Sequence, residues 1–211
     1  MKLCRSFFRV AATVAIAASL IGGPEPARAQ AQNDQAGTFI ATLANQALGI
    51  LQQPNLTLEQ REVLVRDLLR SGFDVAFIGR FVLGKHWATA TNEQRDEYQR
   101  LFGEFVVKTY AARLGGYAGE RFAITTVRDA GEKDSLVHTQ IVRPAGPPLE
   151  CDWRVRVIDG QPRIIDVMVE GISMVVTQRS EFASVIQRTG VEGLLATLRA
   201  KTGRLSATQS S

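Results

Sequence analysis

Residues 149–170 read LECDWRVRVIDGQPRIIDVMVE, and apolar side chains alternate along this segment with mostly polar or charged ones. A period of two places successive side chains on opposite faces of a β-strand. Asp159-Gly160 divides the segment and is a favoured pair for a two-residue hairpin turn. Residues 149–158 and 163–170 are therefore predicted to form an antiparallel hairpin. Its apolar face is expected to carry Cys151, Trp153, Val155, Val157, Ile165, Val167 and Val169.

Two segments upstream show the same alternation, at residues 121–128 and 135–143. Turn-forming residues separate the segments, at 130–133 (AGEK) and 144–148 (PAGPP). Short turns between consecutive strands predict an antiparallel meander. Because helical periodicity precedes and follows this block, we expect an α+β fold with a twisted four-stranded antiparallel sheet and helices on one face.

Apolar residues three and four positions apart predict four helices before the sheet and two after it. The first covers residues 37–53, before Pro54, and Gly72 and Gly84 end the next two. Polar caps mark three starts, at the Thr57/Gln60 capping box, at Asp74 and at the Thr91/Gln94 capping box. The helix that begins near Thr91 is the longest, and Gly115-Gly116 kinks or ends it. The last two helices are expected at residues 176–189 and 191–203.

The first 29 residues have the features of a secretory signal peptide. Three basic residues precede an apolar run at residues 10–21, which is shorter than the about 20 residues that span a bilayer. Ala27-Arg28-Ala29 offers the small residues of a cleavage site, so we expect cleavage after about Ala29 and export to the periplasm. The alternative is an uncleaved N-terminal membrane helix. The expected organisation is a signal peptide (1–29), a flexible N-terminus (30–36), one domain (37–203) and a flexible tail (204–211).

The charge of the chain changes when the signal peptide is set aside. The full sequence has 25 Lys and Arg against 21 Asp and Glu. Residues 1–29 hold four of the basic residues and one of the acidic ones, so the remainder has a net charge of +1. A nucleic-acid-binding protein is expected to keep a basic patch, so nucleic acid is excluded as a partner class. Cys151 is the one cysteine left after cleavage, and we expect a buried thiol without a disulfide.

The sequence offers few candidate residues for catalysis or metal binding. His86 and His138 are the two histidines, and neither lies in a cluster with metal-ligand spacing. No nucleophile, phosphate-loop or dinucleotide motif is present, so no cofactor is predicted. Asp166 has apolar neighbours, and alternation turns it to the opposite face of its strand. The sequence is instead rich in aromatic residues near the long helix, and periodicity alone does not distinguish a packed core from a lined cavity.

Three blocks of residues resemble the MlaC/toluene-tolerance family of periplasmic phospholipid-binding proteins. They are residues 73–81 (FDVAFIGRF) followed by Trp87, the long helix from Gln94 to Tyr110, and residues 165–174 (IDVMVEGISM) followed by Arg179 and Glu181-Phe182. The resemblance extends over about residues 39–202. Pro162 stands where relatives often carry Trp, which affects a detail of packing in the fourth strand.

The resemblance implies a cone like that of nuclear transport factors, in which helices wrap a twisted antiparallel sheet around a deep apolar pocket. It implies a non-enzymatic lipid carrier whose partners are phospholipid, an inner-membrane ABC transporter with a lipid-shuttling MCE domain, and an outer-membrane lipoprotein–porin complex. Hopanoid-cluster relatives make a polycyclic lipid the alternative cargo. Two other readings remain open: a small enzyme of the same fold with Asp166 or His138 at the pocket floor, and an adaptor domain with a solid core.

Alternation and resemblance together suggest which apolar side chains contact the lipid. These residues are Phe77, Phe81, Phe102, Phe105, Val106, Tyr110, Leu114, Trp153, Val155, Val157, Ile165, Val167, Val169, Ile172, Met174 and Phe182.

Overall fold

The computed structural model describes residues 25–114 and 119–209. The helices are α1 (Glu25–Leu51), α2 (Leu58–Gly72), α3 (Val75–Leu83), α4 (His86–Thr89), α5 (Asn92–Leu114) and α6 (Met174–Gln209). The strands are β1 (Arg121–Asp129), β2 (Asp134–Val142), β3 (Leu149–Ile158), β4 (Gln161–Val169) and β5 (Ile172–Ser173). The predicted signal peptide lies mostly outside the described residues, as do Gly115 and Gly116. No helix in the described ranges is long and apolar enough to cross a membrane.

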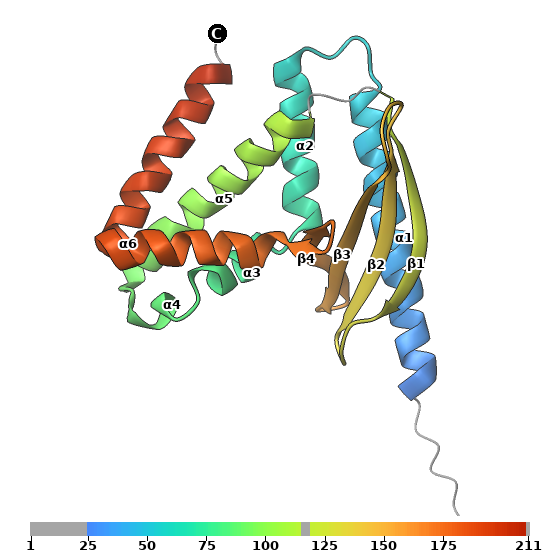
Figure 1. The fold of residues 1–211 in the computed structure, drawn as a ribbon, viewed down its shortest axis with the longest axis horizontal. Coiled ribbons are helices and arrows are strands. Elements are labelled where there is room, and N and C mark those ends of the chain that lie inside the picture. Colours follow the sequence, from blue (N-terminus) through green and yellow to red (C-terminus); the bar gives the residue numbers. More distant parts are fainter. Residues whose placement is uncertain (1–24, 115–118, 210–211) are drawn as a thin grey trace, which may run out of the picture.

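The strands form one open antiparallel sheet in the order β1-β2-β3-β4-β5 (Figure 1). The four predicted strands are present, and their turns are the predicted ones. Asp159 and Gly160 both have positive φ, 49° and 77°, as a type I′ hairpin requires. The sheet has five strands rather than four, because the chain turns back after Gly171 and β5 pairs with the end of β4. A cone like that of nuclear transport factors remains a prediction.

A bulge in β4 alters the predicted alternation. Arg154 pairs with Asp166, whereas its neighbour Val155 pairs with Ile164. Ile165 is therefore the extra residue of the bulge. Ile164 and Ile165 are both buried, whereas strict alternation would place only one of two adjacent side chains on the apolar face.

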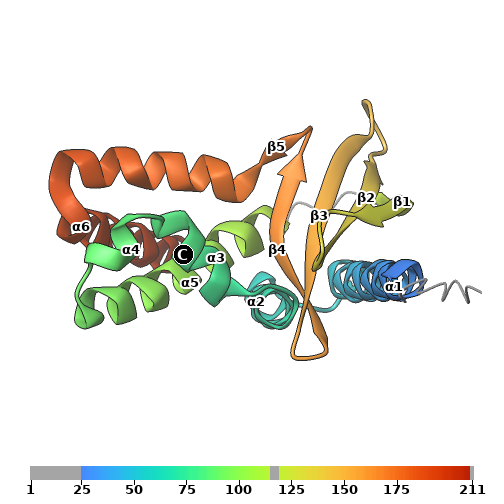
Figure 2. The same ribbon diagram turned by 90° about the horizontal axis from the view of Figure 1, so that it is seen from below.

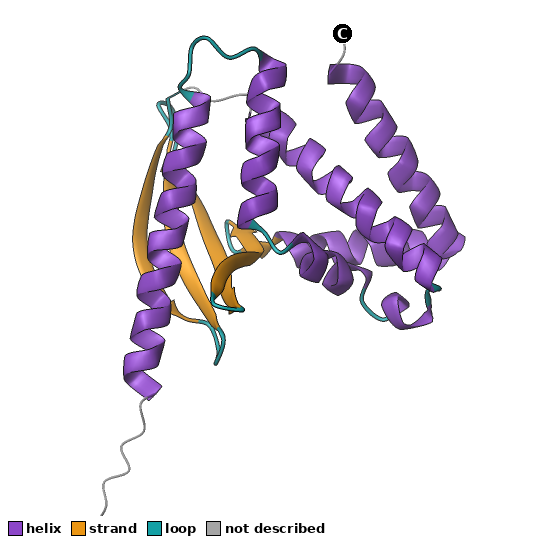
Figure 3. Ribbon diagram, turned by 180° about the vertical axis from the view of Figure 1, so that it is seen from behind, coloured by secondary structure: helices purple, strands orange, loops and turns teal. Residues whose placement is uncertain are grey.

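Helix α1 covers one face of the sheet, as seen from behind in Figure 3. It begins at Glu25, so residues 30–36, which we expected to be flexible, are helical. Two contacts explain the difference. Ala36 is buried against the sheet together with Ile40, and Asn33 donates a hydrogen bond to Asp129 at 2.9 Å. Tertiary packing therefore stabilises a helical segment that its polar sequence does not predict.

The remaining helices pack beside the sheet rather than over it, and α2 lies between α1 and α5 (Figure 1). The predicted caps are confirmed. Thr57 and Gln60 exchange capping hydrogen bonds of 3.0 and 3.2 Å, Thr91 and Gln94 do so at 3.1 and 3.2 Å, and Asp74 caps α3. These polar residues fix where the helices start.

Helix α6 consists of two helical segments that meet at Gly190. Its φ of 71° and ψ of 179° are not helical, and this region is open essentially to glycine alone. Figure 2 shows the first segment passing over α3 and α4 before the chain turns. The second segment continues past Gly203, where we expected it to end, because a lone glycine inside a helix costs only about 1 kcal/mol.

The interior has two apolar clusters. The first joins α3, α5 and α6 and includes Tyr98, Phe102 and Phe182. The second lies between α1 and the sheet and includes Ile40 and Val155. Phe73 packs against both clusters, and its neighbour Asp74 donates its N–H to the carbonyl of Ile164 at 3.0 Å. The segment between α2 and α3 therefore connects the helical layer to the sheet.

Candidate functional site

Fifteen of the sixteen side chains predicted to contact lipid divide by burial into three groups. The fully buried ones are Phe102, Val155, Ile165 and Phe182. The half-buried ones are Phe77, Phe105, Val106, Tyr110, Trp153, Val157, Val167, Val169 and Met174. Phe81 and Ile172 are exposed. The side chain of Leu114 lies outside the described residues.

The buried aromatic side chains of α5 and α6 pack against one another. The ring of Phe102 lies 5.6 Å from that of Tyr98 and 6.2 Å from that of Phe182. The hydroxyl of Tyr98 donates to the carbonyl of Gly79 at 3.0 Å, and burial raises its pKa far above the ordinary value. Phe102 and Phe182 therefore fill a core. Phe105, whose ring lies 6.2 Å from that of Phe182, is at the half-buried edge of this cluster.

Trp153 is held in place on the sheet by a chain of hydrogen bonds. Its indole N–H donates to Oγ1 of Thr139 at 2.9 Å, and this hydroxyl donates to the carbonyl of Cys151 at 2.7 Å. Its ring lies 6.4 Å from that of Phe122. Because the polar atom of the indole is satisfied within the sheet, the half-buried ring presents apolar surface.

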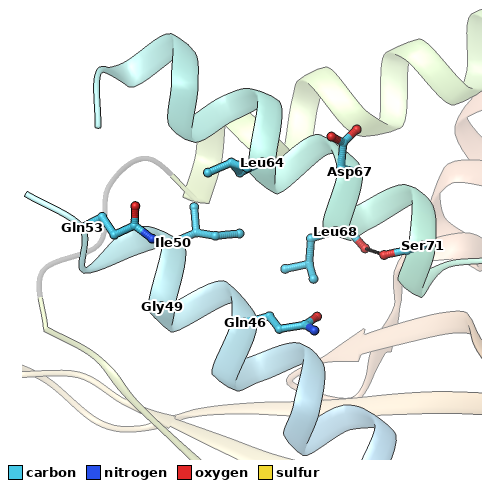
Figure 4. Close-up of a pocket in the computed structure, with 8 residues that line it drawn as sticks. All are labelled: Gln46, Gly49, Ile50, Gln53, Leu64, Asp67, Leu68 and Ser71. Atoms are coloured by element: carbon cyan, nitrogen blue, oxygen red, sulfur yellow. Dashed lines mark hydrogen bonds between the residues drawn. The ribbon is translucent and has the colours of Figure 1, made fainter. Parts of the chain in front are cut away.

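An open groove lies between the second half of α1 and α2, with a volume of about 500 Å³ (Figure 4). Ile50, Leu64 and Leu68 point into it from the two facing helices. A side chain at Gly49 would meet nothing within 4 Å, so the wall of α1 is open there. The rest of the lining is polar and consists of Gln46, Gln53, Asp67 and Ser71. The groove is within the range of roughly 300–1,000 Å³ that small-ligand pockets span.

None of the sixteen predicted residues lines this groove, so sequence reasoning missed it. Ile50, Leu64 and Leu68 do recur with the apolar spacing of the two helices. One available signal was the apolar run Val63-Leu64-Val65, which is wider than one packed face of a helix; in the structure Val63 and Leu64 are 44% and 39% exposed. A second was Gly49 inside an otherwise regular helix.

A second hollow, of about 380 Å³, lies between α3, α4 and the start of α6. It brings together two of the predicted residues, Phe77 and Phe81, with Trp87. Arg80 and Arg179 also line it, and each guanidinium lies over an aromatic ring: Arg80 over Trp87 at 5.7 Å and Arg179 over Phe81 at 5.0 Å. The walls of the hollow are thus aromatic, and its two arginines give it a positive charge.

The residues that an enzyme would need lie on the opposite face of the sheet from α1. Oδ1 of Asp152 lies 2.6 Å from Nδ1 of His138, and Arg128 donates to the other ring nitrogen at 2.7 Å. Asp166 accepts the hydroxyl of Ser173 at 2.6 Å. Neither His138 nor Asp166 lines the groove or the hollow. These groups therefore make structural hydrogen bonds.

Two other chemistries receive no support from the described residues. Cys151 is buried, as predicted, and burial together with nearby carboxylates raises the pKa of its thiol to about 11. A thiol with so high a pKa is a poor nucleophile at neutral pH. No group of three or more His, Cys, Asp or Glu within residues 25–114 and 119–209 is arranged to hold a metal ion.

Comparison with known proteins gives one consistent result. The family model described as "MlaC protein" matches residues 41–200. The intermembrane phospholipid transport system binding protein MlaC of Haemophilus influenzae is 24% identical over 156 residues, which cover 72% of this chain and 71% of the relative. The crystal structure of a phospholipid-binding protein from Ralstonia solanacearum, in complex with a phospholipid, aligns with a TM-score of 0.72 and 26% identity. That alignment covers 82% of this chain and 99% of the other.

Proposed function

The chain belongs to the MlaC family, and from this premise we propose that it binds phospholipid and carries it between the inner and outer membranes. The observation that carries the proposal is the likeness to the Ralstonia solanacearum protein, which holds a phospholipid and matches most of this chain. The curated relative named as a component of an intermembrane phospholipid transport system supports the same role.

The physical chemistry of the cargo explains what such a carrier must provide. Exposing the tails of a diacyl lipid to water places on the order of 30 methylenes in contact with it, at about 0.8 kcal/mol each, or roughly 24 kcal/mol in all. A carrier must therefore cover the acyl chains while the headgroup stays hydrated. Because apolar contact is non-directional, such a site needs few fixed polar groups and no catalytic residue.

We place the entrance for an acyl chain at the groove between α1 and α2. Ile50, Leu64 and Leu68 offer apolar contact there, and the polar rim leaves room for a hydrated group. Further contacts with the acyl chains are assigned to the half-buried members of the predicted set, such as Phe105 and Trp153. The four fully buried members fill the core and are not assigned to lipid.

The setting of this function follows from the same proposal. A carrier between two membranes works in the periplasm, which agrees with the signal peptide expected at residues 1–29. Its proposed partners are an inner-membrane ABC transporter with a lipid-shuttling MCE domain and an outer-membrane lipoprotein–porin complex.

The deciding experiment is mass spectrometry of lipid extracted from the purified protein. We expect about one phospholipid for each chain, and transfer of labelled phospholipid from vesicles to delipidated protein. Protein that carries no lipid and takes up none from vesicles would overturn the proposal. Recovery of a hopanoid in place of phospholipid would retain the carrier and change its cargo.

A further inference from the structure

We propose that the aromatic hollow between α3, α4 and the start of α6 receives the phosphate of an anionic phospholipid in a bilayer, so that this face of the protein docks on the membrane. The inference builds on the proposed function, because a carrier must meet a membrane or a partner embedded in one. It assigns a surface and a chemistry that are separate from the α1–α2 groove.

The first argument is uncompensated positive charge. Arg80 and Arg179 line the hollow, and neither makes an ion pair with a carboxylate in the described part of the chain. Arg95, beside Trp87, donates to the carbonyls of Trp87 and Ala88 at 2.8 and 3.2 Å. Because these acceptors are neutral, they do not offset its positive charge next to the hollow. Guanidinium groups match the geometry of phosphate, to which they donate two parallel hydrogen bonds.

The second argument is that the fold holds these arginines in position. The guanidinium of Arg179 lies over Phe81, and those of Arg80 and Arg95 lie over Trp87. A Cβ at Gly84 would come within 2.9 Å of Nε of Arg179, so a glycine is needed for this arginine to lie where it does. Gly84 also has a φ of 59°, which disfavours a side chain in its own right. Stacking leaves the N–H edges of a guanidinium free for an anion.

The third argument is the apolar rim. Large hydrophobic side chains are rarely exposed in the described residues. Two of those that are lie in α3 and α6, which border this hollow, and a third lies in β5, directly before α6. Phe81 is 36% exposed, Val176 51% and Ile172 59%. Val176 precedes Arg179 by three residues and so shares its face of α6. Aromatic and aliphatic side chains next to arginines are typical of surfaces that enter the headgroup region of a membrane.

The test is vesicle flotation with three variants of the full chain. The double variant R80Q/R179Q removes both charges, R80K/R179K keeps them, and R188Q removes an exposed arginine of α6 outside the hollow. The vesicles contain phosphatidylcholine alone, or phosphatidylglycerol in place of part of it. Each arginine near an anionic surface contributes about fivefold in affinity, so R80Q/R179Q is expected to bind anionic vesicles roughly thirtyfold more weakly. R188Q is expected to bind as the unchanged chain does. R80K/R179K is expected to bind more weakly than the unchanged chain but more strongly than R80Q/R179Q, because lysine keeps the charge and lacks the paired donors of a guanidinium. Added salt is expected to weaken all binding.

Three results would overturn the docking proposal. These are equal flotation of R80Q/R179Q and R188Q, equal binding to the two kinds of vesicle, and competition by soluble glycerol 3-phosphate as strong as that by vesicles. The last would assign the hollow to a free phosphate ester. Lipid extracted from the same preparations reports separately on the carrier function, because R80Q/R179Q is expected to retain its bound lipid. Preparations with normal lipid content and unaltered flotation would therefore refute docking at this hollow and leave the carrier intact.

Discussion

Ser173 donates a hydrogen bond from its hydroxyl to the carboxylate of Asp166 at 2.6 Å, which ties the end of β4 to the start of α6. The same carboxylate accepts the N–H of Val175 at 3.3 Å, and the Ser173 hydroxyl accepts the N–H of Val176 at 3.1 Å. Two free N–H groups in the first turn of α6 are therefore satisfied by side chains. This explains why the acid and the serine occur together in the segment 165–174 that resembles the family.

Replacing Asp166 by Ala is expected to lower the free energy of unfolding by about 1–2 kcal/mol, because it removes a cap and leaves the serine without its acceptor. Urea denaturation followed by circular dichroism measures the change. Glu132→Ala, in an exposed turn, is the matched control and should change little. In the double variant with Ser173→Ala, the loss of free energy of unfolding should be smaller than the sum of the losses in the two single variants. Fully additive losses would show that the two side chains act independently.

Gly49→Leu is expected to reduce the lipid content of the purified protein without destabilising it. A side chain at this position meets open space and fills the α1–α2 groove, while leucine is favoured over glycine in a helix by roughly 0.5–1 kcal/mol. The measurement is extracted lipid per chain, together with the thermal midpoint. Gly203→Leu, at a second helical glycine with open space beside it, should keep its lipid. Full lipid content in Gly49→Leu would remove the groove from the acyl-chain path.

Stability at acid pH is expected to depend on Asp134. Burial alone would raise the pKa of this carboxyl, but hydrogen bonds from Arg156 and Arg154 and their charges outweigh burial, so the pKa is lowered. A carboxyl with a folded pKa below its unfolded value of about 3.9 contributes stability that is present above that pH and is lost as the pH falls through the folded pKa. The free energy of unfolding should therefore fall steeply below about pH 4.

Asp134→Asn is expected to reduce the fall in stability below about pH 4. It is also expected to lower the free energy of unfolding at pH 7 by about 2–3 kcal/mol, because two arginines lose their charged partner. Urea titrations across the acid range test both effects. Asp96→Asn, at an exposed position of α5, serves as the control and should lose stability at acid pH as the unchanged chain does. An unchanged pH dependence in Asp134→Asn would assign the acid sensitivity to other carboxyls.

Cys151 is expected to resist thiol reagents in the folded protein. Burial, together with Asp152, Glu170 and Glu150, raises the pKa of its thiol to about 11, so little thiolate forms at neutral pH. In protein that lacks residues 1–29, in which Cys151 is the remaining thiol, labelling should be slow in buffer and fast in urea. Rapid labelling of the folded variant would show that the strand opens locally.

Much of the fold follows from local patterns. The strand pair around Asp159-Gly160, the two Thr–Gln capping boxes and the break at Gly190 each depend on a few neighbouring residues, and the structure contains all of them. The differences arise where distant segments meet. Residues 30–36 are helical because Asn33 and Ala36 contact the sheet, and β5 exists because the chain folds back onto β4. No short-range pattern carries that information.

The candidate sites show the same division. Apolar spacing identified the faces of α1 and α2, but it did not show that Ile50 and Leu64 line an open groove while Phe102 and Phe182 fill a core. A helical period reports which side chains share a face and not what lies opposite. The hollow at Arg80 and Arg179 joins residues about a hundred positions apart, so composition and spacing could not predict it.

The sequence by itself determined the four long strands, the helix boundaries set by caps and turns, the buried thiol and, through its resemblance, the family. These properties depend on alternation, capping and turn chemistry within a few residues. The tertiary structure alone decided which apolar side chains are packed and which are open, which cations lack a partner, and where the ends of α1 and the edge of the sheet lie. These depend on the space and charge that distant segments present to one another, which are set only when the chain has folded.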